Sequence, residues 1–396
     1  MKDDTAMVHL GRDPEKHQGI VNPPVYHAST ILFPTVKDYL NRSKGDSKYR
    51  GVRYGTSGTP TTFALADTVA ELEGGEGAVV VSSGLSAITL AILAFVKQGD
   101  HILVCDSVYG PTRKFCDTVL TRYGIETTYY DPLIGKDISL LFKENTRLVF
   151  TESPGSMTFE VQDIPAISSA AHDGDLLVMM DNTWGTPLFF KPFNHGVDVS
   201  IQAGTKYMSG GSDLVIGIIT AKTEALFRDI KDTTMAFGEI AAPDDCYLTL
   251  RGLRSMGARL RQQQAATIKI TEWLQKRPEV KRVLYPPLIG DPGHAIWKRD
   301  FTGACSLFGL VLNTESFEAV SRMLDGYRYF KLGSSWGGFE SLAIPAIPAI
   351  TRVTVPWTEK GYLVRMHIGL EDPDDLIQDL EYGFTRLNHV LQVENP

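Results

Sequence analysis

An acidic and a basic side chain follow two apolar segments that lie close together in the sequence. Residues 176–180 run directly into Asp181, and residues 197–203 are followed two positions later by a threonine and Lys206. A carboxylate can keep a pyridinium nitrogen protonated, and a lysine amine can form a Schiff base with an aldehyde. The pair therefore predicts a pyridoxal 5'-phosphate (PLP) site and an enzyme of amino-acid chemistry.

Each of the two residues has another interpretation when it is taken alone. Asp181 could cap a helix or join an ion pair, and Lys206 could be a solvated residue at the end of a strand. Their joint placement favours the cofactor site, because ligands of parallel sheets bind at the carboxyl ends of the strands. Burial beside a cationic ring and a phosphate would make the Lys206 amine lose its proton readily and become nucleophilic.

A turn between strand 78–81 and a helix expected from Leu85 to about residue 97 could bind a phosphate. Ser83 and Gly84 occupy this turn. The free N–H groups and the positive end of a helix both favour an anion. Turns of this composition are common, so the turn alone is weak evidence for a phosphate site. The acid and the lysine farther along the chain strengthen this interpretation.

Two more side chains have types and positions that would suit the same site. Tyr109 follows strand 101–105, where its ring could face a cofactor plane or could simply pack at the strand end. Arg365 lies within the apolar strand 363–368, where an unpaired guanidinium is costly. Its expected partner is a substrate carboxylate, with an internal Asp or Glu as the alternative.

Composition excludes several classes of function. The chain has 396 residues and a net charge of −8, which predicts two domains and disfavours binding to nucleic acid or to acidic membranes. The N-terminus lacks the apolar core of a signal peptide, and no apolar stretch reaches membrane-spanning length, so we expect a cytoplasmic protein. Four scattered cysteines indicate free, mostly buried thiols in a reducing compartment; they are Cys105, Cys116, Cys246 and Cys305.

No metal site is expected, because the spacing of histidines and cysteines matches no metal-binding pattern. Glu71 and Glu73 are expected to be exposed charges of a helix. Five histidines receive no role, and they are His9, His17, His101, His195 and His294.

Strand and helix patterns alternate along the first two thirds of the chain, which predicts an α/β fold with a mostly parallel sheet. Expected strands are 78–81, 101–105, 127–130, 147–151, 176–180, 197–203 and 214–220, and expected helices are 62–73, 85–97, 111–122 and 164–172. After about residue 242 the pattern predicts a smaller α+β domain. Its expected helices are 245–256, 258–275, 316–324 and 373–387, and its expected strands are 280–284, 306–312 and 363–368.

These patterns divide the chain into three parts. Residues 1–60 form an extended N-terminal segment, residues 61–242 a PLP-binding large domain, and residues 243–396 a C-terminal small domain. A segment as long as the first, with little regular structure, is either disordered or lies across another surface. Its tyrosines and apolar residues favour contact with a neighbouring subunit.

Across most of its length the chain resembles the Cys/Met-metabolism PLP-dependent enzymes. The matching stretches are 58–61 (GTPT), 71–75 (ELEGG), 152–156 (ESPGS), 181–184 (DNTW), 200–207 (SIQAGTKY), 335–342 (SWGGFESL) and 365–372 (RMHIGLED). The resemblance implies fold type I of the PLP-dependent transferases and a homotetramer built from two catalytic dimers. It also implies that PLP is the cofactor.

The resemblance assigns a role to each matching position. Lys206 would be the Schiff-base lysine, Asp181 the partner of the pyridine nitrogen, and Tyr109 the residue stacked on the ring. Arg365 would bind the substrate α-carboxylate. Lys206 and Tyr109 would be the catalytic residues. Phosphate contacts would come from Gly84, Leu85 and Thr205, and further substrate contacts from Ser335 and Trp336. Tyr54 of the neighbouring subunit would contact both the cofactor and the substrate.

The chain departs from the family pattern at two places. Thr56, followed by Ser57, occupies the position where the family usually has an arginine that pairs with the phosphate across the subunit interface. Arg53 or another group would have to substitute, or PLP would bind less tightly. Ser334 stands where β-lyases often carry a tyrosine, which would enlarge the distal substrate pocket or admit water to it.

The implied reaction is β-elimination from L-cystathionine or a related cysteine thioether, with homocysteine, pyruvate and ammonia as products. Ala203 before the lysine and Trp336 after the serine favour β-elimination over γ-chemistry within the family. The alternatives are a γ-lyase, a cysteine desulfhydrase and an amino-acid racemase. A non-enzymatic PLP-holding regulator is a further alternative, but no DNA-binding helix pair or basic face supports it.

Overall fold

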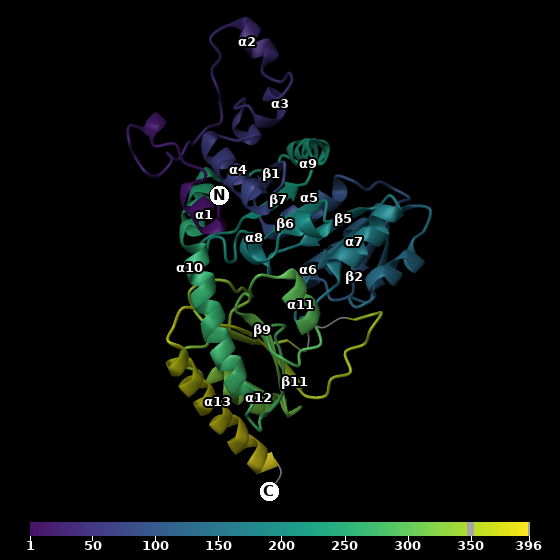
Figure 1. Ribbon diagram of the computed structural model, residues 1–396, viewed down its shortest axis with the longest axis vertical. Coiled ribbons are helices and arrows are strands. Elements are labelled where there is room, and N and C mark those ends of the chain that lie inside the picture. Colours follow the sequence, from purple (N-terminus) through teal and green to yellow (C-terminus); the bar gives the residue numbers. More distant parts are fainter. Residues whose placement is uncertain (347–351, 395–396) are drawn as a thin grey trace.

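The computed structural model describes residues 1–346 and 352–394. Two sheets organise the described chain, and their strands fall on either side of residue 242 in the sequence. In Figure 1 the larger sheet lies in the upper half of the molecule and the smaller sheet in the lower half. The catalytic candidates come from both halves.

The larger sheet has seven strands in the order β1-β7-β6-β5-β4-β2-β3. Strand β7 is antiparallel to both of its neighbours, and the other pairs are parallel, so the predicted mostly parallel α/β fold is confirmed. Several strands are buried along their whole length, as expected for a sheet covered by helices. The strands are β1 Gly77–Val81, β2 His101–Cys105, β3 Glu126–Tyr130, β4 Thr146–Glu152, β5 Leu177–Asp181, β6 Val199–Gln202 and β7 Gly217–Ala221.

Helices cover this sheet, and side-chain caps define where several of them begin. Thr59 caps the helix over 60–73, and Ser83 caps the next one, each with its hydroxyl accepting a backbone N–H of the first turn. The three helices α4, α5 and α9 pack against β1 and β7, while α7 packs against β4 and β5. The helices are α4 Pro60–Glu73, α5 Gly84–Leu93, α6 Gly110–Phe115, α7 Ile164–Asp173, α8 Thr186–Phe189 and α9 Glu224–Ala236, with short helical turns η3 Cys116–Leu120, η4 Gly135–Leu141 and η5 Pro192–His195.

The prediction that Glu73 is an exposed helix charge is wrong. Only 2% of this residue is exposed, and its carboxylate accepts hydrogen bonds from Ser200 Oγ at 2.7 Å and Gln202 Nε2 at 2.8 Å. The helical pattern of α4 shows which face is apolar, but it does not show that two polar side chains of β6 lie opposite that face. Glu71 is exposed, as predicted.

The two helices expected at 245–256 and 258–275 form one continuous helix, α10, over Pro243–Leu274. Helix α1, Asp3–His9, packs along it: Arg254 Nη1 donates to the Met7 carbonyl at 2.6 Å, and Arg261 Nη1 to Asp4 Oδ1 at 3.0 Å. Helix α10 also packs on α4 and, farther along, on α13, Pro373–Glu394. It therefore runs from the upper half of the molecule into the lower half (Figure 1).

The smaller sheet has four antiparallel strands in the order β10-β11-β9-β8. The predicted smaller α+β part is confirmed, but one edge strand, β10, was not predicted. The strands are β8 Val280–Leu284, β9 Leu307–Leu312, β10 Leu342–Pro345 and β11 Tyr362–His367, and the helices besides α10 and α13 are α11 His294–Asp300 and α12 Phe317–Asp325.

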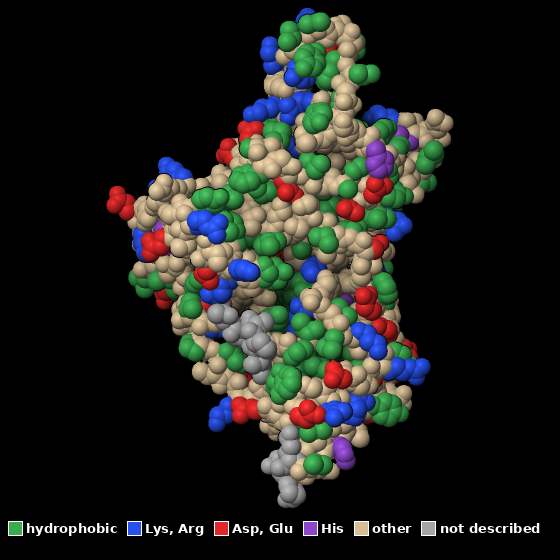
Figure 2. Space-filling model, turned by 180° about the vertical axis from the view of Figure 1, so that it is seen from behind, with side chains coloured by type: hydrophobic (Ala, Val, Ile, Leu, Met, Phe, Trp, Pro, Cys, Tyr) green, Lys and Arg blue, Asp and Glu red, His purple; other side chains and the backbone are tan. Residues whose placement is uncertain are grey.

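The N-terminal region has more regular structure than the sequence indicated. Helix α1 is anchored to the molecule through the buried side chains of Ala6 and Met7. The segment that follows projects from the upper half (Figure 1), and Figure 2 shows apolar side chains over its tip. It carries η1 Glu15–His17, α2 Val36–Asn41, α3 Ser47–Arg50 and η2 Gly55–Ser57. Contact between this projecting segment and a neighbouring subunit stays a prediction.

All four cysteines are free and buried, as predicted. Burial raises the pKa of the Cys116, Cys246 and Cys305 thiols to about 12, and it raises the pKa of Cys105 as well. Among the described residues no three or more His, Cys, Asp and Glu side chains gather in a way that could hold a metal ion. None of the described helices combines the length and the apolar character needed to cross a bilayer.

Candidate active site

The strands that precede the predicted site residues end at the same edge of the larger sheet. Strands β2, β4, β5 and β6 are parallel, and β1 runs in their direction because β7 is antiparallel to both β1 and β6. A cavity of about 390 Å³ opens at this edge. It is lined by every predicted site residue except Tyr54: Gly84, Leu85, Tyr109, Asp181, Thr205, Lys206, Ser335, Trp336 and Arg365.

Asp181 is the last residue of β5, and a threonine fixes the direction of its carboxylate. Oδ1 accepts the hydroxyl of Thr183 at 2.6 Å and the backbone N–H of Thr183 at 3.0 Å. The same hydroxyl oxygen accepts the N–H of Ala203 at 2.9 Å, which ties the ends of β5 and β6 together. Thr183 was not predicted as a site residue, although it lies within the DNTW motif two positions after Asp181.

Lys206 follows the end of β6, and its amine reaches the part of the cavity formed by the small domain. Nζ donates to Ser335 Oγ at 2.7 Å and lies 5.2 Å from the centre of the Trp336 ring. Burial, followed by the positive charge of Arg365, lowers the pKa of Lys206 to about 8, while the Asp181 carboxylate opposes the shift. The pKa is shifted in the predicted direction, and about a tenth of the amine is unprotonated at pH 7, far more than for an ordinary lysine.

Glu152 is a second carboxylate of the cavity, and no role was predicted for it. It ends β4 in register with Asp181 on β5, and its Oε2 accepts the backbone N–H of Tyr109 at 2.7 Å. Burial and then the neighbouring Asp181 raise the pKa of Glu152 well above its usual range. Burial also raises the pKa of Asp181, but two hydrogen bonds from Thr183 and the positive charge of Lys206 oppose that shift, so Glu152 is the more readily protonated of the two carboxyl groups.

The signal for Glu152 was present in the sequence. An acid that ends a buried strand is the same pattern that identified Asp181, and the ESPGS stretch contained it. The structure adds the reason for its presence: its contact with the Tyr109 backbone fixes the start of α6 at the cavity wall.

The N-terminus of α5 offers unpaired backbone donors to an anion. The Ser83 hydroxyl accepts the Ser86 N–H, whereas no acceptor within the described parts of the chain pairs with the N–H groups of Gly84 and Leu85. A Cβ atom at Gly84 would lie 2.7 Å from the Ala203 Cβ, so only glycine allows α5 to approach β6 this closely. Thr205 lines the cavity, but its hydroxyl already bonds to the Ile216 backbone at 2.9 and 3.1 Å.

Arg365 projects from β11 into the cavity, and its partners are backbone carbonyls. Its Nη2 donates to Ser335 O at 2.9 Å, to Ser334 O at 3.1 Å and to Gly333 O at 3.5 Å. Within the described residues no Asp or Glu forms an ion pair with this guanidinium, so the alternative of an internal acid is not realised there. Burial lowers the pKa of Arg365 to about 10, and it stays charged at neutral pH.

Tyr54 lies outside this cavity, on the projecting segment, with 53% of its surface exposed. Arg53, the candidate substitute for the missing phosphate-binding arginine, donates instead to Ser43 Oγ at 2.9 Å and to Met235 Sδ at 3.2 Å. Thr56 is exposed at the same segment. None of the three residues lines the cavity of its own chain, so their roles toward a neighbouring subunit stay predictions.

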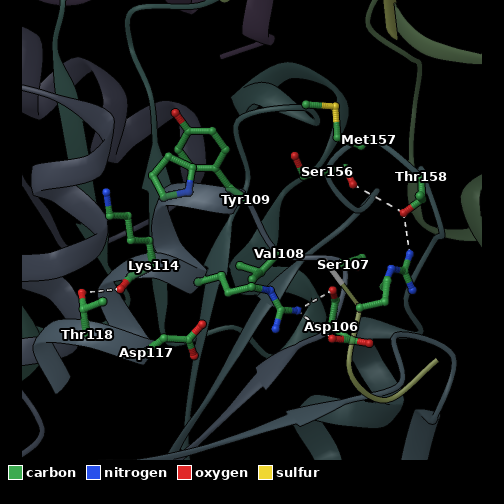
Figure 3. Close-up of a pocket in the computed structure, with 14 residues that line it drawn as sticks. Asp106, Ser107, Val108, Tyr109, Lys114, Asp117, Thr118, Ser156, Met157 and Thr158 are labelled. Atoms are coloured by element: carbon green, nitrogen blue, oxygen red, sulfur yellow. Dashed lines mark hydrogen bonds and ion pairs between the residues drawn. The ribbon is translucent and has the colours of Figure 1, made fainter. Parts of the chain in front are cut away.

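A second hollow of about 390 Å³ adjoins the catalytic cavity and shares Tyr109, Ser156 and Met157 with it. In Figure 3 Ser156 and Met157 lie on one side of this hollow, and Lys114 lies on the opposite side. The two hollows meet at Tyr109.

Known proteins that resemble this chain do so over nearly its whole length. Residues 4–385 match the family model described as Cys/Met metabolism PLP-dependent enzyme. The Escherichia coli protein named cystathionine beta-lyase MetC is 41% identical over 97% of this chain and 98% of its own length. A Wolbachia pipientis protein named L-alanine/L-glutamate racemase is 42% identical over 98% of both chains.

A solved structure with the same fold is cystathionine gamma synthase from Xanthomonas oryzae pv. oryzae, in complex with aminoacrylate and cysteine. It superposes with a TM-score of 0.90 at 31% identity and covers 98% of this chain and 99% of its own. The family match spans both sheets and every residue of the cavity. The chain therefore belongs to the Cys/Met metabolism family of PLP-dependent enzymes, which have the type I fold.

Proposed function

We propose that the chain is a PLP-dependent carbon–sulfur β-lyase that cleaves L-cystathionine to homocysteine, pyruvate and ammonia. The observation that carries the proposal is the Lys206 amine, with its pKa lowered to about 8, in one cavity with Asp181 and Arg365. A nucleophilic amine, an anion and a carboxylate-binding cation are the three groups that this chemistry requires.

The residues of the cavity fit the cofactor of the family. The unpaired N–H groups of Gly84 and Leu85 at the start of α5 suit its phosphate. Asp181, oriented by Thr183, suits a protonated ring nitrogen, and the Tyr109 ring at the cavity wall suits the cofactor plane. When bound, PLP supplies the electron sink that makes the Cα proton of an amino acid acidic.

The chain's own side chains then perform the remaining tasks. Arg365 binds the substrate α-carboxylate and so fixes the direction of the Cα–H bond relative to the cavity. The Lys206 amine removes the Cα proton and returns a proton to the departing thiolate. Its hydrogen bond to Ser335 Oγ holds the amine on the small-domain side of the cavity between these two steps.

Two residues support β-elimination over related reactions. Ala203 precedes the lysine by three positions, and Trp336 follows Ser335, whereas γ-acting relatives show serine and leucine there. The Wolbachia relative gives a specific reason to keep racemisation as the second candidate, since it resembles this chain as closely as the Escherichia coli lyase does. Racemisation needs the same proton removal, followed by return to the opposite face.

Product analysis tests the proposed function. The purified, PLP-saturated protein is incubated separately with L-cystathionine, L-cystine, L-methionine and L-alanine, and the products are separated by chromatography. We expect pyruvate and homocysteine in equal amounts from L-cystathionine. Cysteine with 2-oxobutyrate would indicate a γ-lyase instead, and D-alanine without pyruvate release would indicate a racemase. Either result would reject the β-lyase assignment.

The lowered pKa of Lys206 predicts how cofactor uptake depends on pH. Only the unprotonated amine attacks an aldehyde, so the rate at which apo-protein acquires PLP absorbance should rise with pH and level off above about 8. An ordinary lysine, with its pKa near 10.4, would instead keep the rate rising by about tenfold per unit up to pH 10. Stopped-flow absorbance between pH 6 and pH 10 distinguishes the two profiles, with free lysine and PLP as the control.

We also propose a cytoplasmic homotetramer in which Tyr54 of one subunit enters the cavity of its neighbour. Exposed apolar side chains on the projecting segment support this assembly; they include Ile20, Leu32, Val36 and Leu40. Buried free thiols suit a reducing compartment.

Mixing inactive Tyr54→Ala and Lys206→Ala variants after mild dissociation should restore activity, because each hybrid dimer contains one site with both an intact Tyr54 and an intact Lys206. No recovery in hybrids of confirmed composition would contradict the shared site.

A further inference from the structure

Buried polar contacts link the small sheet to the turn that carries the catalytic lysine. His367 is the last residue of β11, and only 1% of it is exposed. One ring nitrogen, Nδ1, lies 3.0 Å from Ser306 Oγ, and the other, Nε2, accepts the backbone N–H of Gly337 at 3.1 Å. His367 therefore joins the residue before β9 to the loop that contains Ser335 and Trp336.

The same contacts continue from Ser306 to the residue that follows Lys206. The Ser306 N–H donates to the Tyr207 hydroxyl at 3.1 Å, and the two hydroxyl groups lie 3.2 Å apart. The Tyr207 ring also packs at 5.5 Å from Trp336 and at 6.0 Å from His367. His367 is thus two hydrogen bonds away from the side-chain hydroxyl of Tyr207, the residue next to Lys206.

The partners of His367 determine which ring nitrogen carries the proton. An amide N–H can only donate, so Nε2 must accept from Gly337, and the ring hydrogen therefore resides on Nδ1 and donates to Ser306 Oγ. The Gly338 carbonyl also lies 3.3 Å from Nε2, but it already accepts Gln263 Nε2 at 3.0 Å. Burial lowers the pKa of His367 to about 3, so the ring stays neutral in the working pH range.

The loop over 333–338 is held at both ends by residues of β11. Arg365 donates to the Ser334 and Ser335 carbonyls, and His367, two residues later on the same face of the strand, accepts from Gly337. Gly337 has a φ of +89°, and a Cβ there would lie 2.9 Å from the carbonyl carbon of Lys206. The loop backbone therefore lies close against the lysine turn and leaves no space for a side chain at Gly337.

We propose that His367 is a positioning residue that sets where the Lys206 amine meets Ser335 Oγ. It does so by clamping the Ser335–Trp336 loop to the Tyr207 side of the lysine turn through Gly337 and Ser306. His367 touches neither substrate nor cofactor, since it does not line the cavity. In its kinetic part this inference rests on the proposed function, and a buried histidine that only stabilises the fold is the alternative to be tested.

Three single substitutions, two of His367 and one of Ser306, separate the two halves of the clamp. His367→Gln places an amide oxygen near the position of Nε2 and so keeps an acceptor for the Gly337 N–H. His367→Asn places an amide nitrogen near the position of Nδ1, keeps the donor to Ser306 and leaves the Gly337 N–H unpaired. Ser306→Ala removes the other end of the clamp without altering the histidine.

A matched control is available in the larger sheet. His101 is also fully buried, with its ring nitrogens 2.9 Å from Thr146 Oγ1 and 2.8 Å from Thr128 Oγ1. It opens β2 at the end of the strand opposite to the cavity. His101→Gln therefore perturbs a buried, hydrogen-bonded histidine of the same type without touching the loop or the lysine turn.

The measurements are the melting temperature of the apo-protein, the midpoint of the pH titration of the visible PLP absorbance, and kcat/KM for pyruvate release. Since misplacing a catalytic group by 1 Å costs about 10²-fold, we expect His367→Asn to lower kcat/KM by about 10²-fold and Ser306→Ala by about tenfold. His367→Gln should recover most of the loss. The absorbance midpoint should move by about one pH unit in His367→Asn, because the Lys206 surroundings change. His101→Gln should lower only the melting temperature.

The proposal is overturned if folded His367→Asn and Ser306→Ala keep both the absorbance midpoint and kcat/KM of the wild type while their melting temperatures fall. Should His367→Asn not fold, Ser306→Ala decides by the same criteria, and His367→Gln should stay close to the wild type because it keeps the acceptor for the Gly337 N–H. Failure of the proposed function shows separately, as a wild-type protein that releases no pyruvate from L-cystathionine. In that event the absorbance midpoint, which needs no substrate, still tests the role of His367.

Discussion

Lys206→Ala is expected to lower pyruvate release from L-cystathionine by at least about 10⁴-fold, because one amine both binds the cofactor and transfers the proton. Its contact with Ser335 Oγ and its lowered pKa of about 8 suit this amine to both proposed tasks. The measurement is pyruvate formation coupled to a dehydrogenase, at saturating PLP. The variant should also lack the visible absorbance that the wild type acquires with PLP.

A second buried lysine makes this prediction specific. Burial, and then the charge of Arg53, also lowers the pKa of Lys231 to about 8, but Lys231 donates to the Ser57 carbonyl and lies outside the catalytic cavity. Borohydride reduction of the PLP-loaded wild type, followed by peptide mapping, should therefore label Lys206 alone. Label on Lys231, or pyruvate release by Lys206→Ala near the wild-type rate, would show that the assignment is wrong.

Arg365→Leu is expected to lower kcat/KM by about 10²–10³-fold, as losing one partner of a buried charge pair usually does. The guanidinium uses Nη2 for the loop carbonyls, which leaves its other N–H groups for the two oxygens of a substrate carboxylate. Arg365→Lys should not restore activity, because a lysine ammonium cannot make the bidentate contact.

Binding measurements distinguish loss of substrate contact from damage to the cavity. The affinity of Arg365→Leu for PLP, measured on apo-protein by fluorescence, should stay close to the wild-type value. Its affinity for glycine, which carries the α-carboxylate and no side chain, should fall together with kcat/KM. An equal loss of affinity for PLP and for glycine would mean that Arg365 mainly supports the loop over 333–338.

The sequence pattern was sufficient to identify the residues that lie at the centre of the cavity. Asp181 and Lys206 each follow a buried strand, and the edge at which parallel strands end is fixed by topology, so the two residues had to meet. Arg365 was found because a charge within an apolar strand needs a partner. For these residues the local environment in the sequence already contains the reason for their position.

Other residues depend on partners that are distant in the sequence. Glu73 lies at the end of a helix with the composition of an exposed charge, and it is buried only because Ser200 and Gln202 lie opposite it. His367 has no ligand spacing, and its contacts with Ser306 and Gly337 follow from the packing of a strand against a loop. The hydrophobic pattern of a single segment cannot predict such contacts between distant parts of the chain.

The same distinction applies to the elements of the fold. Strands of the larger sheet were predicted to within a few residues, since they are continuous apolar runs between turns. The edge strand β10 is short and ends in Pro345, which removes a donor, so its pairing with β11 was not visible in the sequence. Helix α10 continues without a break through residues 256–258, and its contacts with α1 and α13 could not be read from residues 243–274.

Burial of all four cysteines has a consequence for an enzyme that liberates a thiol in every cycle. A protein thiolate can attack the disulfide of homocystine, the oxidised form of homocysteine, to give a mixed disulfide and one released homocysteine, and this exchange requires a thiolate that the disulfide can reach. With its thiols inaccessible and the pKa of Cys116, Cys246 and Cys305 raised to about 12, the chain offers almost no such partner. Mixed-disulfide formation with the oxidised product is thereby disfavoured, and we expect the activity to stay the same when the ratio of thiol to disulfide around the protein changes.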